Sequence, residues 1–258
     1  MEWISENTHR LATSAHREGD HYLLRGQKYY ISGVDEADAI LVVASTGTDE
    51  RGRARLSLFI VDTDAPGLVK QQLPVSVTLP ERQFTLYFDD VRVGADALVG
   101  TEGDGFAHVF HGLNPERITG AALAVGVGRY ALARASQYAS NRVVWDQPIG
   151  AHQGVAHPLA AAKIEVELAA LMTARAAWLH DNGKPAGEAS NMAKYAAAEA
   201  ALAAVDAAIQ SHGGNGLAAE YGLIPLWGLA RLLRVAPVNR EMILNYVAQH
   251  SLGLPRSY

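Results

Sequence analysis

The sequence predicts an α+β protein in which an antiparallel β-barrel or sandwich is followed by an up-down helical bundle. Up to about residue 100, short apolar runs alternate with turn residues at nearly regular spacing, as in all-β domains. Beyond that point, long stretches with apolar residues at helical spacing are joined by short connections, which favour antiparallel neighbours. We therefore expect a β-domain over residues 1–103 and a helical domain over residues 104–258.

The composition is that of a globular protein with a sizeable core. The 258 residues are 49% apolar and carry a net charge of −5. No Lys/Arg run of the kind that binds nucleic acid occurs, and no apolar stretch is long enough for a membrane span. There is no cysteine, which excludes disulfides and thiolate chemistry. The first residues lack the apolar segment of a secretory signal, so we expect a cytoplasmic protein.

Eight short strands are expected in the β-domain. Turn residues such as Gly19-Asp20, Arg25-Gly26 and Ala65-Pro66-Gly67 separate them. The expected strands are Arg10–His16, His21–Leu24, Lys28–Ser32, Ala39–Ser45, Leu56–Asp62, Gly67–Leu73, Gln83–Phe88 and Asp96–Val99.

Long helices are expected after Gly103-Asp104-Gly105, which ends the strand pattern. A short helix should reach His111, and a long helix should then begin at Pro115, because Asn114 is a good N-cap residue and proline suits the first helical position. The long helix should end near Asn141. A loop over Arg142–Gly150 should precede a helix ending at His180 and further helices over 187–212, 219–234 and 238–250.

Glu116 is the most suggestive single residue, because this pattern places it in the first turn of the long helix at the domain boundary. A carboxylate there can simply complement the helix dipole, or it can act as a base held between two structural layers. The residues alone leave both interpretations open.

Two other clusters have ordinary structural interpretations. His152 and His157 lack a third ligand at metal spacing, so no metal site is expected. Gly213-Gly214-Asn215-Gly216 follows a helix with no preceding strand, and so indicates a helix C-cap and not a dinucleotide fingerprint.

Five segments, in this order along the chain, resemble acyl-CoA dehydrogenases. The resemblance covers essentially the whole chain and implies the middle β-domain and the C-terminal four-helix bundle of that family, which together hold FAD. The closing Gly253–Tyr258 is similar to the ending of a bacterial branch of the family. The five segments are Lys28–Gly33, Phe88–Val93, Gly112–Ile118, Arg142–Gln153 and Gln210–Gly216.

The resemblance implies a set of cofactor-binding residues, carried over one at a time. An aromatic ring shields the flavin from water and a hydroxyl can donate to it, which suits Tyr30 and Ser32. Arg142 matches an arginine at the FAD pyrophosphate. Asp146 departs from the family, which usually has glycine there. The remaining matches are Trp145, Ile149, His152 and Gln153 in the loop, and Gln210, Gly213 and Gly214 in the segment that reaches FAD across a dimer interface.

The implied reaction is α,β-dehydrogenation of an acyl-CoA thioester, and the resemblance bears on its catalytic base. Many members carry a glutamate in the loop before the last helix, where Pro237 aligns in this chain. A minority place the base inside a Leu-x-x-Glu-Arg pattern, and Leu113–Arg117 fits that pattern. The resemblance therefore favours Glu116 as the base. Arg117 lies about 100° further around a helix and should orient substrate or loop.

The chain departs from the family at its start, where full members have a helical domain that this chain lacks. Ser5–Arg10 resembles a shortened remnant of a flavin and substrate segment. We therefore expect FAD to be held weakly and dehydrogenase activity to be small in the chain alone.

The implied partners are an acyl-CoA, an electron-transferring flavoprotein, and further copies in a homodimer or homotetramer or a fuller subunit in a hetero-oligomer. The alternatives are a non-catalytic subunit or fragment that keeps the assembly surface, and a flavin monooxygenase of the same fold.

Overall fold

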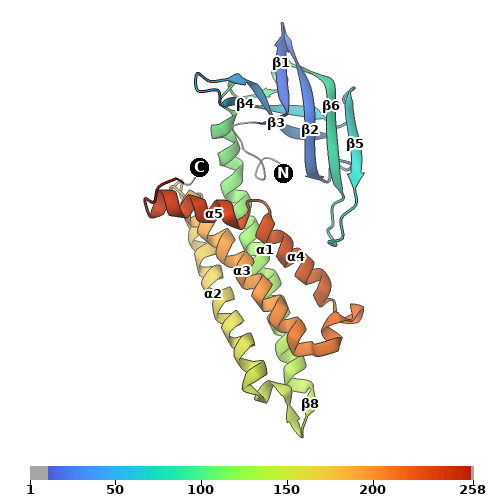
Figure 1. Cartoon of the computed structure of the whole chain (residues 1–258), viewed down its shortest axis with the longest axis vertical. Coiled ribbons are helices and arrows are strands. Elements are labelled where there is room, and N and C mark those ends of the chain that lie inside the picture. The colour runs from blue at the N-terminus through green and yellow to red at the C-terminus, as the bar shows by residue number, and fades with distance from the viewer. Residues whose placement is uncertain (1–10, 257–258) are drawn as a thin grey trace. The chain divides into compact units, whose positions relative to one another are not determined.

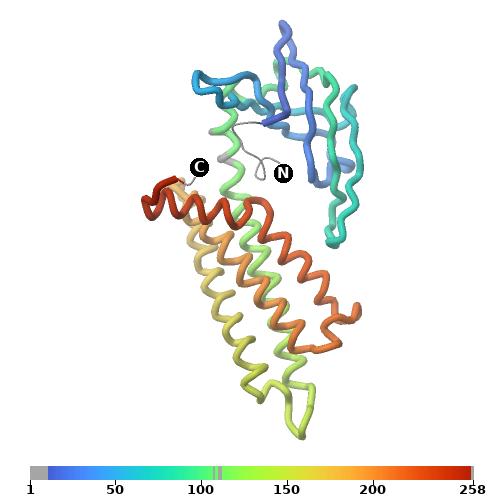
Figure 2. The backbone as a smooth tube through the Cα atoms, viewed as in Figure 1, coloured from blue at the N-terminus to red at the C-terminus, as the bar shows by residue number. Residues whose placement is uncertain are grey.

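The computed structural model describes residues 11–256, apart from the side chains of residues 107, 110 and 111. The chain divides into two compact units, the first ending at Leu113 and the second beginning at Asn114. The first unit holds a β-sheet and the second holds packed helices, which confirms the α+β prediction (Figures 1 and 2). The predicted domain boundary between residues 103 and 104 stays a prediction.

The sheet of the first unit has seven strands in the order β5-β6-β2-β1-β3-β4-β7. Neighbouring strands pair antiparallel, except for one parallel pairing between Ser14 of β1 and Ser45 of β3. Figure 1 shows β1, β2, β6 and β5 side by side in this order. The strands are β1 Ser14–Glu18, β2 His21–Ser32, β3 Ala39–Thr48, β4 Ala54–Asp62, β5 Leu68–Leu73, β6 Gln83–Gly94 and β7 Leu98–Val99.

The structure corrects several strand predictions. The sheet is not closed as a barrel: among the described residues, β5 and β7 end the strand order. The two strands expected before and after Gly26 are one strand, β2. Gly26 adopts φ +129°, and an added Cβ would lie 2.8 Å from Cα of Thr13. Glycine therefore lets β2 continue where the backbone of Thr13 packs against it. The strand expected at Asp96–Val99 is half 3₁₀ turn.

The main core of the first unit lies between two parts of the curled sheet, β2 with β6 and β3 with β4, as in a sandwich. Tyr22 and Phe59 meet there with ring centroids 4.9 Å apart. A smaller core holds Leu56 and Leu58, against which Val109 packs from the start of the following helix.

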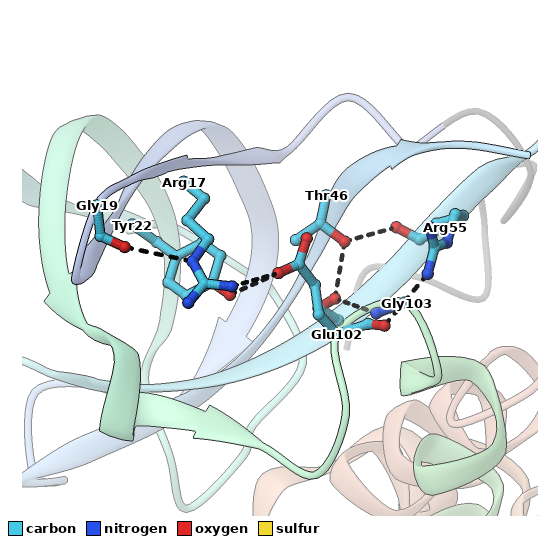
Figure 3. A network of polar contacts seen from close by, with 8 residues as sticks. Arg17, Gly19, Tyr22, Thr46, Arg55, Glu102 and Gly103 are labelled. Atoms are coloured by element: carbon cyan, nitrogen blue, oxygen red, sulfur yellow. Dashed lines mark hydrogen bonds and ion pairs between the residues drawn. The ribbon is translucent and has the colours of Figure 1, made fainter.

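A polar network fixes the segment that leads into this helix (Figure 3). The Tyr22 hydroxyl donates to Oε2 of Glu102 at 2.7 Å, and Arg17 lies 3.6 Å from the same carboxylate oxygen. The Gly103 amide donates to Oγ of Ser57 at 2.8 Å. Burial raises the pKa of Tyr22, and its hydrogen bond to Glu102 raises it further. The network therefore ties this segment to β1, β2 and β4.

Helix α1 (Gly105–Asn141) is continuous, so the predicted break at Asn114-Pro115 is wrong. A proline removes one helical hydrogen bond, and the bonds on either side carry the helix past it. Instead of capping a helix start, the Asn114 side chain accepts from Nη1 of Arg117 at 3.1 Å. Glu116 consequently lies inside α1, where the helix-dipole interpretation does not apply.

The second unit is the predicted helical bundle, and Figure 1 shows α5 crossing one end of it. The expected loop at Arg142–Gly150 contains a small hairpin, β8 (Val143–Val144) with β9 (Gln147–Pro148). Alanines dominate the buried face of α3, which allows close helix packing. None of the described helices is long and apolar enough to cross a membrane. The helices are α2 Gln153–Asp181, α3 Gly187–His212 as predicted, α4 Leu223–Val235, which is shorter than predicted, and α5 Arg240–Tyr246, which continues as a π-helical turn over Val247–Ser251 and so ends near the predicted residue.

Candidate functional site

Glu116 is a half-buried carboxylate on α1. Burial raises its pKa, and the neighbouring positive charge of Arg117 partly opposes the shift. No hydrogen bond or ion pair holds its carboxylate within the described part of the chain. A carboxylate that is partly desolvated and uncommitted can accept a proton more readily than one fixed in an ion pair.

Arg117 points into the bundle and is 6% exposed. Its guanidinium donates to Asn114, and burial lowers its pKa while the Glu116 carboxylate raises it. A Cβ added to Gly187 at the start of α3 would lie 3.7 Å from the Tyr246 hydroxyl and 3.9 Å from Oδ1 of Asn114. Helices α1, α3 and α5 therefore converge closely beside Arg117. This position indicates that Arg117 helps to hold this end of the bundle together.

The turn between α4 and α5 packs onto the helix face that carries Glu116. A Cβ added to Gly120 would lie 3.6 Å from Cδ of Pro237. Gly120 lies one turn after Glu116 on the same face, because residues four apart stack along a helix. Pro237, which the sequence resemblance aligns with a glutamate of many family members, is thus adjacent to the turn of α1 that carries Glu116.

A second polar cluster lies near the other end of α1. The Tyr138 ring stacks on His212 with centroids 4.1 Å apart, and its hydroxyl accepts from Nδ2 of Asn215 at 3.0 Å. Tyr221 meets both rings edge-on. These contacts fix the segment that follows α3 to the last turn of α1.

Arg142 follows this last turn and opens the β8–β9 hairpin. Its side chain is exposed and has no polar partner among the described residues. Trp145 and Asp146 adopt φ of +52° and +61° at the hairpin tip. Trp145 is 82% exposed and meets the His152 ring edge-on, with ring centroids 5.7 Å apart. An exposed tryptophan on a tight hairpin presents a large apolar surface to a ligand or partner.

The Gly213-Gly214 backbone is open. An added Cβ at either residue would meet none of the described residues within 4 Å, whereas at Gly216 it would lie 2.5 Å from the Ile209 carbonyl oxygen. Gly216 is therefore required by packing, and the first two glycines leave their backbone accessible. Gln210, Gln153 and the partly buried Ile149 lie at the same end of the bundle, around the hairpin and the end of α3.

Tyr30 and Ser32 belong to the first unit. A register shift in the β2–β6 ladder between Lys28 and Ile31 places Tyr30 at φ +56° and leaves it 53% exposed. Such a bulge re-aims a side chain out of the ladder. The Ser32 hydroxyl lies 3.1 Å from Oε1 and 3.0 Å from Nε2 of Gln83, so this hydroxyl already has a protein partner.

Some residues of these clusters are not apparent from the sequence. Tyr138 and His212 were not among the predicted site residues, although their positions give a signal. Tyr138 lies one turn before Arg142, and His212 lies within Gln210–Gly216, one of the five segments that resemble the family. Lys194 gives no such signal, because a single lysine in an alanine-rich helix resembles a surface residue. It is 2% exposed. No group of metal-ligating side chains that could hold an ion occurs among the residues that the structure covers.

Known families and structures match both units of the chain. The family model described as acyl-CoA dehydrogenase, middle domain, matches residues 5–91, and the model for the C-terminal domain of the same family matches residues 103–252. Acyl-CoA dehydrogenase FadE12 of Mycobacterium tuberculosis is 57% identical over 254 residues, which cover 98% of this chain and 66% of that protein. The chain thus spans just under two thirds of the length of this curated relative.

Solved structures agree with the sequence matches. The crystal structure of acyl-CoA dehydrogenase from Geobacillus kaustophilus superposes with a TM-score of 0.92 at 27% identity, over 98% of this chain and 68% of that one. Butyryl-CoA dehydrogenase from Megasphaera elsdenii superposes with a TM-score of 0.88 at 28% identity, over 93% of this chain and 63% of that one. With both domain models matched along its length, the chain belongs to the acyl-CoA dehydrogenase family.

Proposed function

We propose that this protein serves the FAD-dependent α,β-dehydrogenation of an acyl-CoA thioester, within fatty acid metabolism, with Glu116 as the base. The observation that carries the proposal is the half-buried Glu116 carboxylate, which has a raised pKa and no hydrogen-bond or ion-pair partner among the described residues. The following turn of the helix packs against Pro237, which the sequence resemblance aligns with a glutamate of many family members. Few structural roles require a carboxylate there, since it contributes no ion pair within the described residues.

The residues present fit FAD. Its pyrophosphate needs a cation and approachable backbone amides, and the exposed Arg142 and the open Gly213-Gly214 backbone offer both. Trp145 and His152 add aromatic surface beside them. The exposed Tyr30 suits a ring that covers the flavin.

In the proposed reaction, FAD supplies the acceptor for the hydride that leaves the β-carbon of the acyl group. Glu116 takes the proton from the α-carbon onto its carboxylate. Its raised pKa brings it closer to the working pH and so strengthens it as a base. Arg117, held by Asn114, keeps the helix turn that bears Glu116 in a fixed orientation.

The proposal is tested by adding acyl-CoA thioesters to the FAD-loaded protein without oxygen and recording flavin absorbance. Bleaching by an acyl-CoA supports a dehydrogenase, and reoxidation by an electron-transferring flavoprotein would identify the partner. A protein that binds FAD but is bleached by no acyl-CoA contradicts the proposal and favours a monooxygenase. A protein that binds no flavin at all favours a non-catalytic subunit.

Replacing Arg142 by alanine should weaken FAD binding by roughly tenfold to a hundredfold, because a charged hydrogen bond contributes about 1.5–3 kcal/mol. The measurement is FAD affinity from the quenching of flavin fluorescence. Arg175→Ala, which removes an exposed arginine of α2, is the matched control and should leave the affinity unchanged. Equal affinities in both variants would remove Arg142 from the cofactor site.

A dimer or dimer of dimers should form, since Glu116 and Arg142 lie too far apart to serve the same FAD. They are separated by about 39 Å of rise along α1 and its extension, which is longer than a dinucleotide spans. The Arg142 end of one copy would then serve the FAD of another. Exposed apolar residues on α2, such as Leu168 and Leu171, offer surface for assembly. Light scattering that shows a monomer at micromolar concentration would contradict this.

A further inference from the structure

Lys194 is a buried charged residue that the proposed reaction does not use. It lies on α3 and is 2% exposed. Its ammonium group donates to the backbone carbonyl of Val238, in the turn between α4 and α5. Burial lowers the pKa of Lys194 to about 8. Burial of a charged ammonium group costs free energy, so close packing alone does not explain a lysine at this position.

The same turn is held to α3 at both of its ends. Arg234, at the end of α4, pairs with Glu199 of α3 at 2.6 Å, and Arg240, at the start of α5, pairs with the same carboxylate at 3.3 Å. Lys194 thus binds the middle of the turn and Glu199 binds both flanks. The charged groups that act on Lys194 are Arg117 of α1, Glu199 of α3 and Glu241 of α5.

The held turn is the one that packs beside the proposed base. Its Pro237 lies against Gly120, one helical turn from Glu116. The Asn239 side chain then accepts from the Met242 amide and begins α5. A displacement of this turn would therefore change the surface next to Glu116 without touching Glu116 itself.

We propose that Lys194 is a positioning residue, which holds the α4–α5 turn against α3 and thereby keeps Pro237 in place beside Glu116. This inference rests on the proposed function for its link to catalysis, while the attachment of the turn stands on its own. The proposal predicts different effects of Lys194 on global stability and on the local position of the turn. The buried charge lowers the stability of the fold, while the hydrogen bond to Val238 fixes the turn.

The test compares Lys194→Met with wild type. Methionine fills similar space without a charge or a donor, so the midpoint of thermal unfolding should stay equal or rise. Hydrogen–deuterium exchange in residues 236–243 should nevertheless become about tenfold faster or more, because the turn has lost its central hydrogen bond. Flavin reduction by an acyl-CoA should slow by roughly tenfold to a hundredfold at unchanged FAD content, the effect of a small misplacement near reacting groups.

Two further variants sharpen the result. Lys194→Arg keeps donors at this position and should retain slow exchange in the turn. Lys184→Met removes an exposed lysine at the α2–α3 connection and should change neither exchange nor reduction. Unchanged exchange in Lys194→Met would overturn the proposal. So would a fall in the unfolding midpoint with faster exchange throughout the bundle, which is the signature of ordinary core packing. The exchange experiment needs no flavin, so a wild-type protein that fails the acyl-CoA assay contradicts only the proposed function.

Discussion

Replacement of Glu116 by glutamine is expected to slow acyl-CoA-dependent flavin reduction by roughly 10²–10⁴-fold or more. Glutamine has nearly the same shape but cannot accept the α-proton. FAD content should be unchanged, since Glu116 is proposed to act on the substrate and not to hold the cofactor. Anaerobic stopped-flow measurement of flavin absorbance gives the rate directly.

The pH dependence of this step follows from the raised pKa of Glu116. The reduction rate should rise as pH increases through that pKa, because only the carboxylate accepts a proton. The folded state holds the proton more tightly than the unfolded chain, so the stability that this group contributes is present below its unfolded pKa and is lost as pH rises through the folded value. At neutral pH the Glu116→Gln variant should therefore unfold at an equal or higher temperature.

Glu165→Gln is the matched control, because it removes an exposed carboxylate of α2 in the same unit. It should reduce flavin at the wild-type rate. A Glu116→Gln variant with full activity would remove Glu116 from the mechanism and leave it a half-buried carboxylate of α1 without a catalytic role.

Replacement of Gly128 by valine is expected to destabilise the bundle by roughly 1–3 kcal/mol or more. Gly128 is buried where α1 meets α2 and α3. An added Cβ would lie 2.8 Å from Cγ2 of Val166 and 3.5 Å from Cα of Ala201, so one neighbour must move. Thermal unfolding should show a midpoint lower by about 2–4 °C for each kcal/mol.

Gly126→Val provides the control two residues earlier on the same helix. Gly126 is exposed, and no atom of the part of the chain that the structure describes would lie within 4 Å of an added Cβ. Valine is a better helix former than glycine, so this variant should be as stable as wild type or slightly more stable. Equal midpoints for the two variants would show that the three helices are not packed as closely as the distances indicate.

The sequence predicts the fold best where one local pattern extends without competition. Helix α3 begins and ends at the predicted residues because its apolar periodicity is long and His212 is followed by glycines. Prediction fails at Asn114-Pro115, where a strong helix-start signal lies inside a helix that continues through it. It also fails at Gly26. Local rules predict a turn at this glycine, but in the structure the backbone of Thr13 packs closely against it.

The candidate site shows a similar division. Glu116 and Arg142 are recognisable because their segments are short and carry specific residue types. Lys194 is not, because the turn that buries it comes from α4 and α5, more than forty positions later in the chain. The burial of Lys194 depends on how distant helices pack, so the residues next to it in the sequence cannot predict it.

The path of α1 determines where the gene can be divided. The first turns of this helix belong to the sheet unit, since Val109 packs on Leu56 and Leu58. A β-fragment that stopped at residue 103 would keep every strand of the sheet but lose this cover, and bare apolar side chains promote aggregation. Separate expression of the sheet therefore requires a reading frame that extends to about residue 113, with a length of helix as its last element.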